Sequence, residues 1–289
     1  VIYVDSGSTD GSVTMARNLG VEVLPLDMTL PFTAARARNA GYQRLLHLHP
    51  NAAFIQFVDG DCEVVAGWIE AARLHLEANA ECAAVCGRRR ERHPEASIYN
   101  RMCDLEWNTP VGDALSCGGD ALYRTTALIQ ADGFRGSLIA GEEPELCLRL
   151  RRNGWRIHRL DHEMTLHDAA ITHWTQWWKR TVRCGHAYAE GAWLHGRSPD
   201  QHWVRETLRA VIWGLVLPMF IVTAVVLAGS VGWLLLLLYP VQCARLSVRD
   251  LSPPLAFFSV AGKFAECQGV AKFCISKLMG RTGRIIEYK

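Results

Sequence analysis

Short apolar runs alternate with longer amphipathic segments along the first part of the chain. The short runs are rich in β-branched residues and indicate buried strands, whereas apolar positions at helical spacing indicate helices. This alternation indicates an α/β fold with a mostly parallel sheet covered on both faces. The polar residues 88–116 are not assigned to a helix or a strand. Strands are expected at 1–5, 21–24, 53–58, 83–87 and 155–160, helices at 12–19, 33–47, 67–80, 143–153 and 173–193, and a strand leading into a helix at 118–128.

A much longer apolar stretch follows in the last third of the chain. No charged residue lies between Arg209 and Arg245, and this span exceeds the ~20 residues that a helix needs to cross a bilayer. Gly229 and Ser230 divide the stretch, and basic residues flank both of its ends, which favours a hairpin with both ends in the cytoplasm. One tilted helix and the buried hairpin of a soluble protein are the alternatives. The expected hairpin consists of helices 208–227 and 231–246.

The segment after the hairpin combines an apolar helical face with a basic tail. Its apolar positions recur at helical spacing, which indicates an amphipathic helix lying at a membrane interface. A helix packed on the main domain is the alternative. Lys and Arg outnumber acids after Pro240, as expected beside the cytoplasmic face of a membrane. The positions of this face are Phe257, Ala261, Phe264, Gln268, Ala271, Ile275 and Leu278, all apolar except Gln268, and the tail carries Arg281, Arg284 and Lys289.

Composition bounds the class of protein. The 289 residues, 49% of them hydrophobic, suffice for one full α/β domain and a smaller appendage. The net charge of +2 argues neither for nor against nucleic acid, and no nucleic-acid partner is predicted. The ten cysteines include no Cys-x-x-Cys pair, which indicates reduced core cysteines in a cytosolic domain. The chain opens inside an apolar run without Met, so we expect a preceding strand to be missing.

Two turns carry carboxylates at the carboxyl ends of predicted strands, where ligands bind in such sheets. Asp59 and Asp61 flank Gly60 directly after the third strand, and carboxylate oxygens suit Mg²⁺ or Mn²⁺. Asp5 ends the first strand and begins a Ser/Gly turn that can present backbone N–H groups to a ligand. Taken alone, either feature also occurs in ordinary turns.

The order of these motifs resembles the family 2 glycosyltransferases over roughly residues 1–195. The resemblance implies a GT-A fold, a nucleotide-diphospho-sugar transferase fold with a Rossmann-like mixed sheet. It also implies an inverting transfer of a sugar from a nucleotide-diphosphate sugar to an acceptor hydroxyl. The motifs are Val-Asp-Ser-Gly-Ser-Thr-Asp-Gly-Ser at 4–12, Asp-Gly-Asp at 59–61, Cys-Gly-Gly-Asp at 117–120, Gly-Glu-Glu at 141–143 ahead of a Leu-x-Leu-Arg helix, and Gly-Trp-Arg-Ile at 154–157.

The resemblance implies nucleotide contacts from two segments. Asp5 would recognise the nucleotide base, and Ser6 and Ser8 belong to the turn that would contact the donor. Arg38 would approach the nucleotide or its phosphates. A UDP-sugar is the favoured donor.

The metal and sugar contacts are implied in the same way. Asp59 would contact the ribose or the metal, and Asp61 would ligate the metal, Mn²⁺ or Mg²⁺. His167 is the candidate third metal ligand because it follows the last strand of the motif order; an ordinary surface or core histidine is the alternative. Gly118 and Gly119 would line the sugar pocket.

The catalytic base is expected at the head of the helix at 143–153. Glu143 stands where the family usually has Asp, which leaves both Glu142 and Glu143 as candidates. Acids that stabilise a helix N-terminus are the alternative interpretation. Lys179 or Arg180, in a Trp-rich segment, would steady the diphosphate, although interfacial docking explains this segment equally well.

The sequence therefore predicts a membrane-bound enzyme. We expect a GT-A catalytic domain at 1–195, a linker at 196–207, the transmembrane hairpin at 208–246, and the interfacial helix with its basic tail at 247–289. The acceptor is expected to be lipid-linked or a growing glycan of the cell envelope or an exopolysaccharide. The expected location is the bacterial inner membrane, with the catalytic domain facing the cytoplasm.

Two other functions fit parts of the pattern. Nucleotidyltransferases also use paired acids and a metal, but they usually carry a Gly-rich phosphate loop with Arg or Lys after the first strand. A non-catalytic membrane subunit would keep the fold and lose the acids, whereas Asp59, Asp61 and Glu143 are all present.

Overall fold

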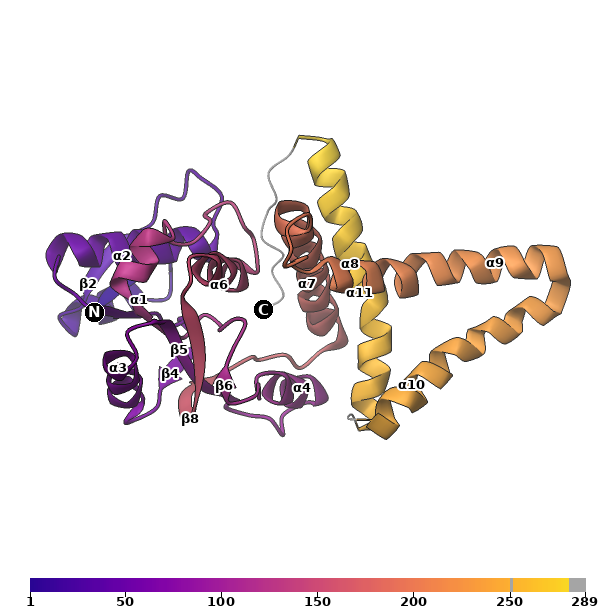
Figure 1. Cartoon of the computed structure of the whole chain (residues 1–289), viewed down its shortest axis with the longest axis horizontal. Helices are drawn as coiled ribbons and strands as arrows, with labels where there is room; N and C mark the ends of the chain where they lie inside the picture. Colours follow the sequence, from indigo (N-terminus) through magenta and orange to yellow (C-terminus); the bar gives the residue numbers. More distant parts are fainter. Residues whose placement is uncertain (250–251, 281–289) are drawn as a thin grey trace. The chain divides into compact units, whose positions relative to one another are not determined.

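The computed structural model describes residues 1–249 and 252–280. The chain forms two compact units, Val1–Thr172 and His173–Lys289 (Figure 1). The helix expected at 173–193 therefore belongs to the second unit, although the sequence analysis grouped it with the catalytic domain. The proposed functional division of the chain stays a prediction.

The first unit contains all the described strands together with six helices. The strands are β1 (Ile2–Asp5), β2 (Glu22–Pro25), β3 (Phe54–Gln56), β4 (Cys62–Val64), β5 (Cys82–Glu91), β6 (Gly112–Asp113), β7 (Leu122–Arg124) and β8 (Arg156–His167). The helices are α1 (Ser12–Asn18), α2 (Ala34–Leu48), α3 (Trp68–Ala78), α4 (Ile98–Glu106), α5 (Thr125–Gln130) and α6 (Glu142–Arg152). The expected strands and helices of this unit are confirmed, with shifted ends.

The main sheet is mixed. Its strand order is β3-β7-β5-β8-β4, with β6 on β8, and β1 and β2 form a separate parallel pair. Strands β5 and β8 pair in parallel, whereas β3 with β7, β5 with β7, β4 with β8 and β6 with β8 are antiparallel. The mixed sheet is confirmed, and the expectation of a mostly parallel sheet is wrong. Strands of two or three residues, such as β4 and β6, carry too little pattern to reveal an antiparallel pairing.

The core of the first unit lies where α3 and α6 pack on the sheet. Trp68, Leu76, Leu146 and Leu150 are all fully buried, and they stand at helical spacing on their helices. The indole Nε1 of Trp68 donates a hydrogen bond of 2.9 Å to Gln56 at the end of β3. This buried packing positions the loops at the carboxyl ends of β3 and β8.

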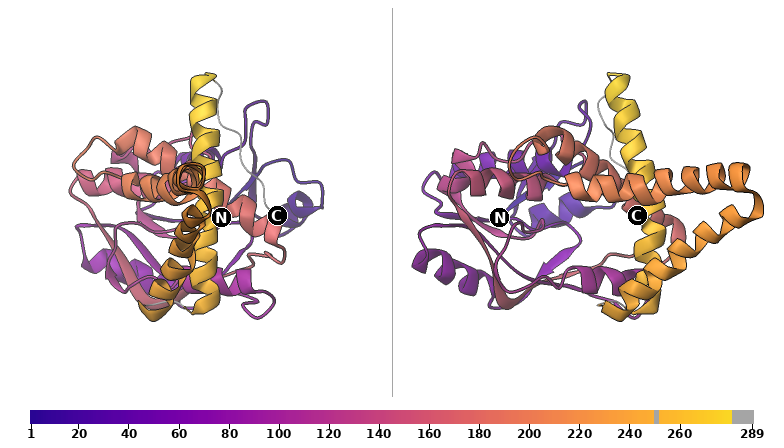
Figure 2. Two further views of the ribbon diagram at one scale, coloured as in Figure 1. Left: turned by 90° about the vertical axis from the view of Figure 1, so that its right-hand side faces the viewer. Right: turned by 45° about the vertical axis from the view of Figure 1, so that its right-hand side comes forward.

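The second unit is helical throughout its described residues. The chain runs out along α8 and α9 and returns along α10 (Figures 1 and 2). The Tyr239 hydroxyl donates to the carbonyl oxygen of Trp213 at 2.9 Å, which ties the two arms together. The elements are α7 (Trp174–His195), α8 (Val204–Val211), the π-helical η1 (Ile212–Val216), α9 (Leu217–Ala228), the 3-10 helical η2 (Gly229–Leu237), α10 (Leu238–Arg249) and α11 (Pro253–Leu278).

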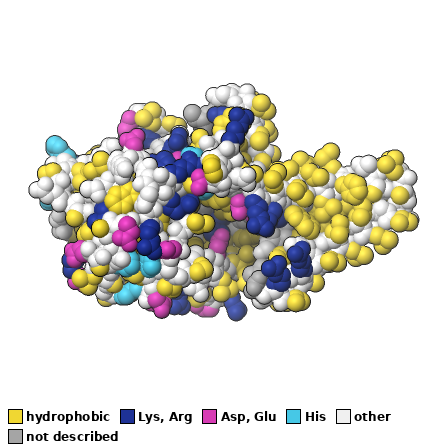
Figure 3. Space-filling view, viewed as in Figure 1, with side chains coloured by type: hydrophobic (Ala, Val, Ile, Leu, Met, Phe, Trp, Pro, Cys, Tyr) yellow, Lys and Arg dark blue, Asp and Glu magenta, His cyan; other side chains and the backbone are white. Residues whose placement is uncertain are grey.

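Apolar side chains cover the hairpin (Figure 3). The helical stretch Val204–Arg249 is long and apolar enough to cross a membrane, and only 11% of its most apolar window is buried. Length and composition alone do not establish a membrane span, so the transmembrane hairpin stays a prediction. The basic tail at 281–289 lies outside the described residues.

Helix α11 presents two different faces. One face packs on α7 and includes the buried residues Ala265, Gly269 and Val270. The apolar positions singled out in the sequence lie largely on the other face, where Phe257 is 54% and Ile275 is 55% exposed. The helix is therefore packed on one side and keeps an exposed apolar surface on the other.

Glycines let α7 and α11 approach closely. A Cβ on Gly269 would overlap backbone atoms of Val182 and His186, and one on Gly185 would overlap the backbone of Glu266. Small residues at a helix crossing allow such close backbone packing.

Gly269→Ala should therefore destabilise the second unit, because overpacking typically costs about 1–3 kcal/mol. The matched change Gly262→Ala on the same helix adds a Cβ at an ordinary 3.5 Å from the Thr181 methyl group, so we expect it to be neutral or slightly stabilising. Thermal unfolding of the full chain in detergent micelles measures the difference. Equal melting temperatures for the two variants would contradict the close crossing.

Candidate active site

The turn after β1 is built around the Asp5 carboxylate. The backbone N–H groups of Gly7 and Ser8 donate to it at 3.0 and 3.2 Å, and Gly7 has a φ of 96° that favours glycine. Hydrogen bonds from Ser8 and Gly7 hold the pKa of Asp5 below its ordinary value, although burial opposes them. Asp5 is therefore ionised, and Ser6 and Ser8 are exposed beside it.

Three carboxylates converge on the guanidinium of Arg38, which α2 carries into the interior of the first unit. Arg38 nitrogens lie 2.6 Å from an Asp59 oxygen, 2.7 Å from Glu142 and 2.9 Å from Glu143. The Arg38 side chain is 10% exposed. Burial alone would lower the pKa of Arg38, but the attraction of Glu143, Asp59 and Glu142 outweighs burial and raises it. The turn after β3 and the head of α6 therefore meet at one buried positive charge.

Gly119 makes room for this contact. A Cβ at Gly119 would lie 2.5 Å from an Arg38 nitrogen and 2.6 Å from an Asp59 oxygen. Any larger residue here would push the ion pair apart. A Cβ at Gly118 would lie 3.9 Å from Arg89, which is an ordinary contact.

The buried carboxylate of Asp120 holds the backbone of Asp59 in place. Its carboxylate accepts the backbone N–H of Asp59 at 2.8 Å and the hydroxyl of Thr165 at 2.8 Å, and it pairs with Arg89 at 2.7 Å. Arg89 also reaches Asp59, at 3.2 Å. Burial would raise the pKa of Asp59, but Arg38 and Arg89 outweigh it and lower the pKa.

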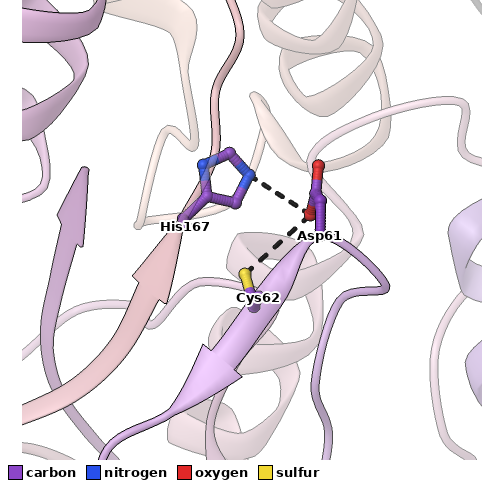
Figure 4. A group of neighbouring side chains, drawn as sticks. All are labelled: Asp61, Cys62 and His167. Atoms are coloured by element: carbon purple, nitrogen blue, oxygen red, sulfur yellow. Dashed lines mark hydrogen bonds and ion pairs between the residues drawn. The ribbon is translucent and has the colours of Figure 1, made fainter. Parts of the chain in front are cut away.

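Asp61 and His167 face each other where β4 pairs with the end of β8 (Figure 4). The Nε2 atom of His167 lies 3.3 Å from an Asp61 carboxylate oxygen, and the Cys62 thiol lies 3.9 Å from the same oxygen. The ring of Trp107 packs edge-on against the imidazole, with centroids 4.7 Å apart. Figure 4 shows the three side chains pointing toward a common point.

The donor atoms of this group fit a divalent metal ion. Ligand atoms of Asp61, Cys62 and His167 all lie within 4.8 Å of one another. A carboxylate oxygen suits Mg²⁺ or Mn²⁺, and an imidazole nitrogen favours a transition metal. Burial raises the pKa of the Cys62 thiol, and sulfur is a soft ligand that suits neither Mg²⁺ nor Mn²⁺. Asp61 and His167 are therefore the residues of this group best suited to hold the ion.

The two glutamates at the head of α6 differ in their surroundings. Gly141, with a φ of 81°, begins the helix, and the side chains of Glu142 and Glu143 are 4% and 15% exposed. Burial, followed by repulsion from Glu142, raises the pKa of Glu143 to about 7, although Arg38 opposes this rise. Glu143 is the more accessible of the pair and the one tuned toward proton transfer near neutral pH.

The sequence-predicted residues do not all meet in one place. Asp59, Glu142 and Glu143 meet through Arg38, with Gly119 beside them. Asp61 and His167 form a second group. The turn at 59–61 connects the two groups, because it carries both Asp59 and Asp61. Asp5 organises its own turn. Arg180 lies on α7 in the second unit, so this geometry does not test its expected contact with the diphosphate. The role of each residue stays a prediction.

Sequence reasoning missed three residues of the site. Asp120 stands within the quoted Cys-Gly-Gly-Asp motif, and its position between a glycine pair and an apolar strand was the available signal. Arg89 lies in the polar run that was left unassigned, yet β5 continues through it. Trp107 follows α4 and carries the Arg89 guanidinium 5.5 Å above its ring.

Comparison with known proteins agrees with this fold and motif order. Residues 1–118 match the model of the family described as Glycosyl transferase family 2. The mannosyltransferase PcManGT from Pyrobaculum calidifontis, solved in complex with GDP-Man and Mn²⁺, aligns with a TM-score of 0.61 and 15% identity over 97% of this chain and 78% of its own. Residues 1–349 of S. aureus TarS align with a TM-score of 0.49 and 14% identity. This alignment covers 97% of this chain and 82% of the TarS chain. No curated protein matches the sequence.

The first unit therefore has the GT-A fold of a glycosyltransferase. The match over residues 1–118 confirms the family resemblance found in the motifs.

Asp120→Asn should destabilise the first unit, because it removes the charge partner of Arg89 in a fully buried network. Breaking a buried pair costs about 3–5 kcal/mol. The matched control is Asp113→Asn. The Asp113 side chain is 63% exposed and pairs with Arg156 at the surface, so this change should alter stability little. Denaturant unfolding of both variants measures the difference, and a stable Asp120→Asn protein would show that Asp120 is dispensable.

Proposed function

We propose that this protein is a metal-dependent, inverting glycosyltransferase. It moves a sugar from a nucleotide-diphosphate sugar to an acceptor hydroxyl. The observation that carries the proposal is the convergence of Asp59 and Glu143 on Arg38, at 2.6 and 2.9 Å. The turn that bears the candidate metal acid and the helix that bears the candidate base thus share one site, as a single-displacement reaction requires.

Glu143 is the proposed catalytic base. It takes the proton of the acceptor hydroxyl while the acceptor oxygen forms a bond to the anomeric carbon of the donor sugar. The bond between that carbon and the diphosphate oxygen breaks, and its electron pair leaves with the nucleoside diphosphate. Attack from the face opposite the leaving group inverts the anomeric centre. A carboxylate with a pKa of about 7 is well matched to this proton transfer.

The charges around the base suit an anionic donor. Asp61 and His167 would hold Mn²⁺ or Mg²⁺, and the imidazole favours Mn²⁺ of the two. When bound, such an ion neutralises charge on the diphosphate leaving group. Arg38 and Arg89 supply further positive charge beside Asp59. Arg38 has to exchange at least one carboxylate partner for a phosphate oxygen if it is to contact the donor.

The donor is proposed to be a UDP-sugar, with a GDP-sugar as the next candidate. PcManGT, the structural neighbour with a TM-score of 0.61, is solved with GDP-Man and Mn²⁺, which makes a GDP-sugar a necessary member of any donor panel. The acidic Asp5 suits recognition of an N–H group on the base.

The acceptor is proposed to be lipid-linked or a growing glycan, at the bacterial inner membrane with the first unit in the cytoplasm. The apolar hairpin between Val204 and Arg249 supports this proposal, and so do the basic residues at both of its ends. An enzyme anchored in a bilayer is concentrated beside acceptors that share that bilayer. Cell-envelope or exopolysaccharide synthesis is the corresponding process.

A donor-hydrolysis panel tests this function. Detergent-solubilised full chain is given UDP-, GDP- and dTDP-sugars with Mn²⁺ or Mg²⁺, and released nucleoside diphosphate is measured. For the active donor, kcat/KM should rise with pH through about 7, because Glu143 accepts a proton only when ionised. Glu143→Gln should lose this rise and about 10²–10⁴-fold in rate. Asp61→Ala should lose the dependence of the rate on added metal.

Surface substitutions of the same kind provide controls. Glu70→Gln and Asp113→Ala alter side chains that are 61% and 63% exposed, and both should behave as wild type. Release of pyrophosphate instead of nucleoside diphosphate would identify a nucleotidyltransferase. Full activity of Asp61→Ala or Glu143→Gln would remove these residues from the mechanism.

A further inference from the structure

An apolar hollow lies in the second unit, between α7, α10 and α11. Its volume is about 500 Å³, within the range of ordinary ligand pockets. Every lining side chain among the described residues is apolar or aromatic, and the one phenolic hydroxyl, that of Tyr239, is already bonded to Trp213. The residues that form most of its wall are Trp174, Trp178, Tyr239, Pro240, Phe257 and Phe264.

A smaller hollow adjoins the first and ends at a positive charge. It measures about 320 Å³ and is lined by Thr175 and Lys179 together with Trp174 and Trp178, which also line the larger hollow. Lys179 is exposed, and no carboxylate in the described part of the chain lies within ion-pair distance of its ammonium group. The two hollows thus share the walls formed by Trp174 and Trp178, and the smaller one has the Lys179 cation in its wall.

The surroundings of the larger hollow suit a lipid. Tyr239 and Pro240 belong to the stretch Val204–Arg249 that is apolar enough for a bilayer. Phe257 and Trp174 in its wall remain 54% and 41% exposed, so an occupant would cover apolar surface that otherwise stays open. An aqueous metabolite would find few hydrogen-bonding partners along this largely apolar wall.

We propose that the larger hollow binds the hydrocarbon chain of a single-chain lipid phosphate, and that Lys179 pairs with the phosphate. One hollow accommodates one chain, which favours a single-chain lipid over a two-chain phospholipid. The inference rests on the proposed function, because this lipid would be the anchor of the lipid-linked acceptor. Aromatic walls supply the contact area for the chain, and the Lys179 ammonium supplies a point charge for the phosphate.

Photolabelling tests the site. Full chain in detergent micelles is irradiated with geranylgeranyl phosphate that carries a diazirine at the end of its chain, and labelled peptides are mapped by mass spectrometry. Label should fall on residues of the wall of the larger hollow, on α10 or α11. Ala261→Trp, which fills the hollow, should lower labelling about tenfold or more. Val226→Trp, on the 77% exposed outer surface of α9, should label as wild type.

The phosphate is tested separately on the exposed Lys179. The corresponding diazirine alcohol, which lacks the phosphate, should label less than the phosphate probe, and Lys179→Gln should abolish this preference while the protein stays folded. The site is overturned if label falls outside the wall, if Ala261→Trp labels as wild type, or if alcohol and phosphate label alike. Competition by dioleoyl phosphatidic acid as strong as that by unlabelled geranylgeranyl phosphate would assign the hollow to bulk phospholipid and overturn the acceptor.

Calorimetric titration of wild-type chain with UDP- and GDP-sugars and Mn²⁺ separates the two proposals. Donor binding without wall labelling overturns the lipid site alone. Wall labelling without binding or hydrolysis of any nucleotide sugar overturns the proposed function and leaves a lipid-binding protein.

Discussion

The buried ion pairs of Arg38 hold the candidate active site together. One guanidinium joins Asp59, on the turn after β3, to Glu142 and Glu143, at the head of α6. With Asp120 and Arg89 included, the cluster contains four carboxyl groups against two guanidinium groups. Burial is the main cause of the raised pKa of Glu143, and the neighbouring carboxylates Glu142 and Asp59 add to it. The excess of acid also makes the site receptive to a divalent cation. Removing a single partner from such a network leaves an uncompensated buried charge.

The two units carry different parts of the proposed function. The first unit carries the acids, the candidate metal ligands and the segment that matches the family. The second unit offers apolar surface, a tight helix crossing at Gly185 and Gly269, and two neighbouring hollows, the smaller of which is lined by Lys179. The proposed donor chemistry and the proposed acceptor anchoring therefore depend on separate sets of residues.

Much of the site was predictable because its residues occur in short, ordered motifs. Asp5, Asp59, Asp61 and Glu143 follow strands or begin a helix, positions that local pattern reveals. Asp120 and Arg89 were not predicted as site residues, because their importance comes from tertiary contacts with each other, which no local pattern encodes. The second half of β5 was not predicted for a similar reason: it runs through three consecutive arginines, Arg88 to Arg90, each of which finds an acidic partner only in the folded protein.

The most direct measurement is donor binding and turnover by Arg38→Gln, with Arg44→Gln as the matched control. Arg44 pairs with Glu22 at the surface, where its side chain is 35% exposed. We predict that Arg38→Gln binds nucleotide sugar and Mn²⁺ about tenfold or more weakly and loses turnover, while Arg44→Gln matches wild type. Wild-type affinity and turnover in Arg38→Gln would contradict the account, because the acids would then need no shared guanidinium to form the site.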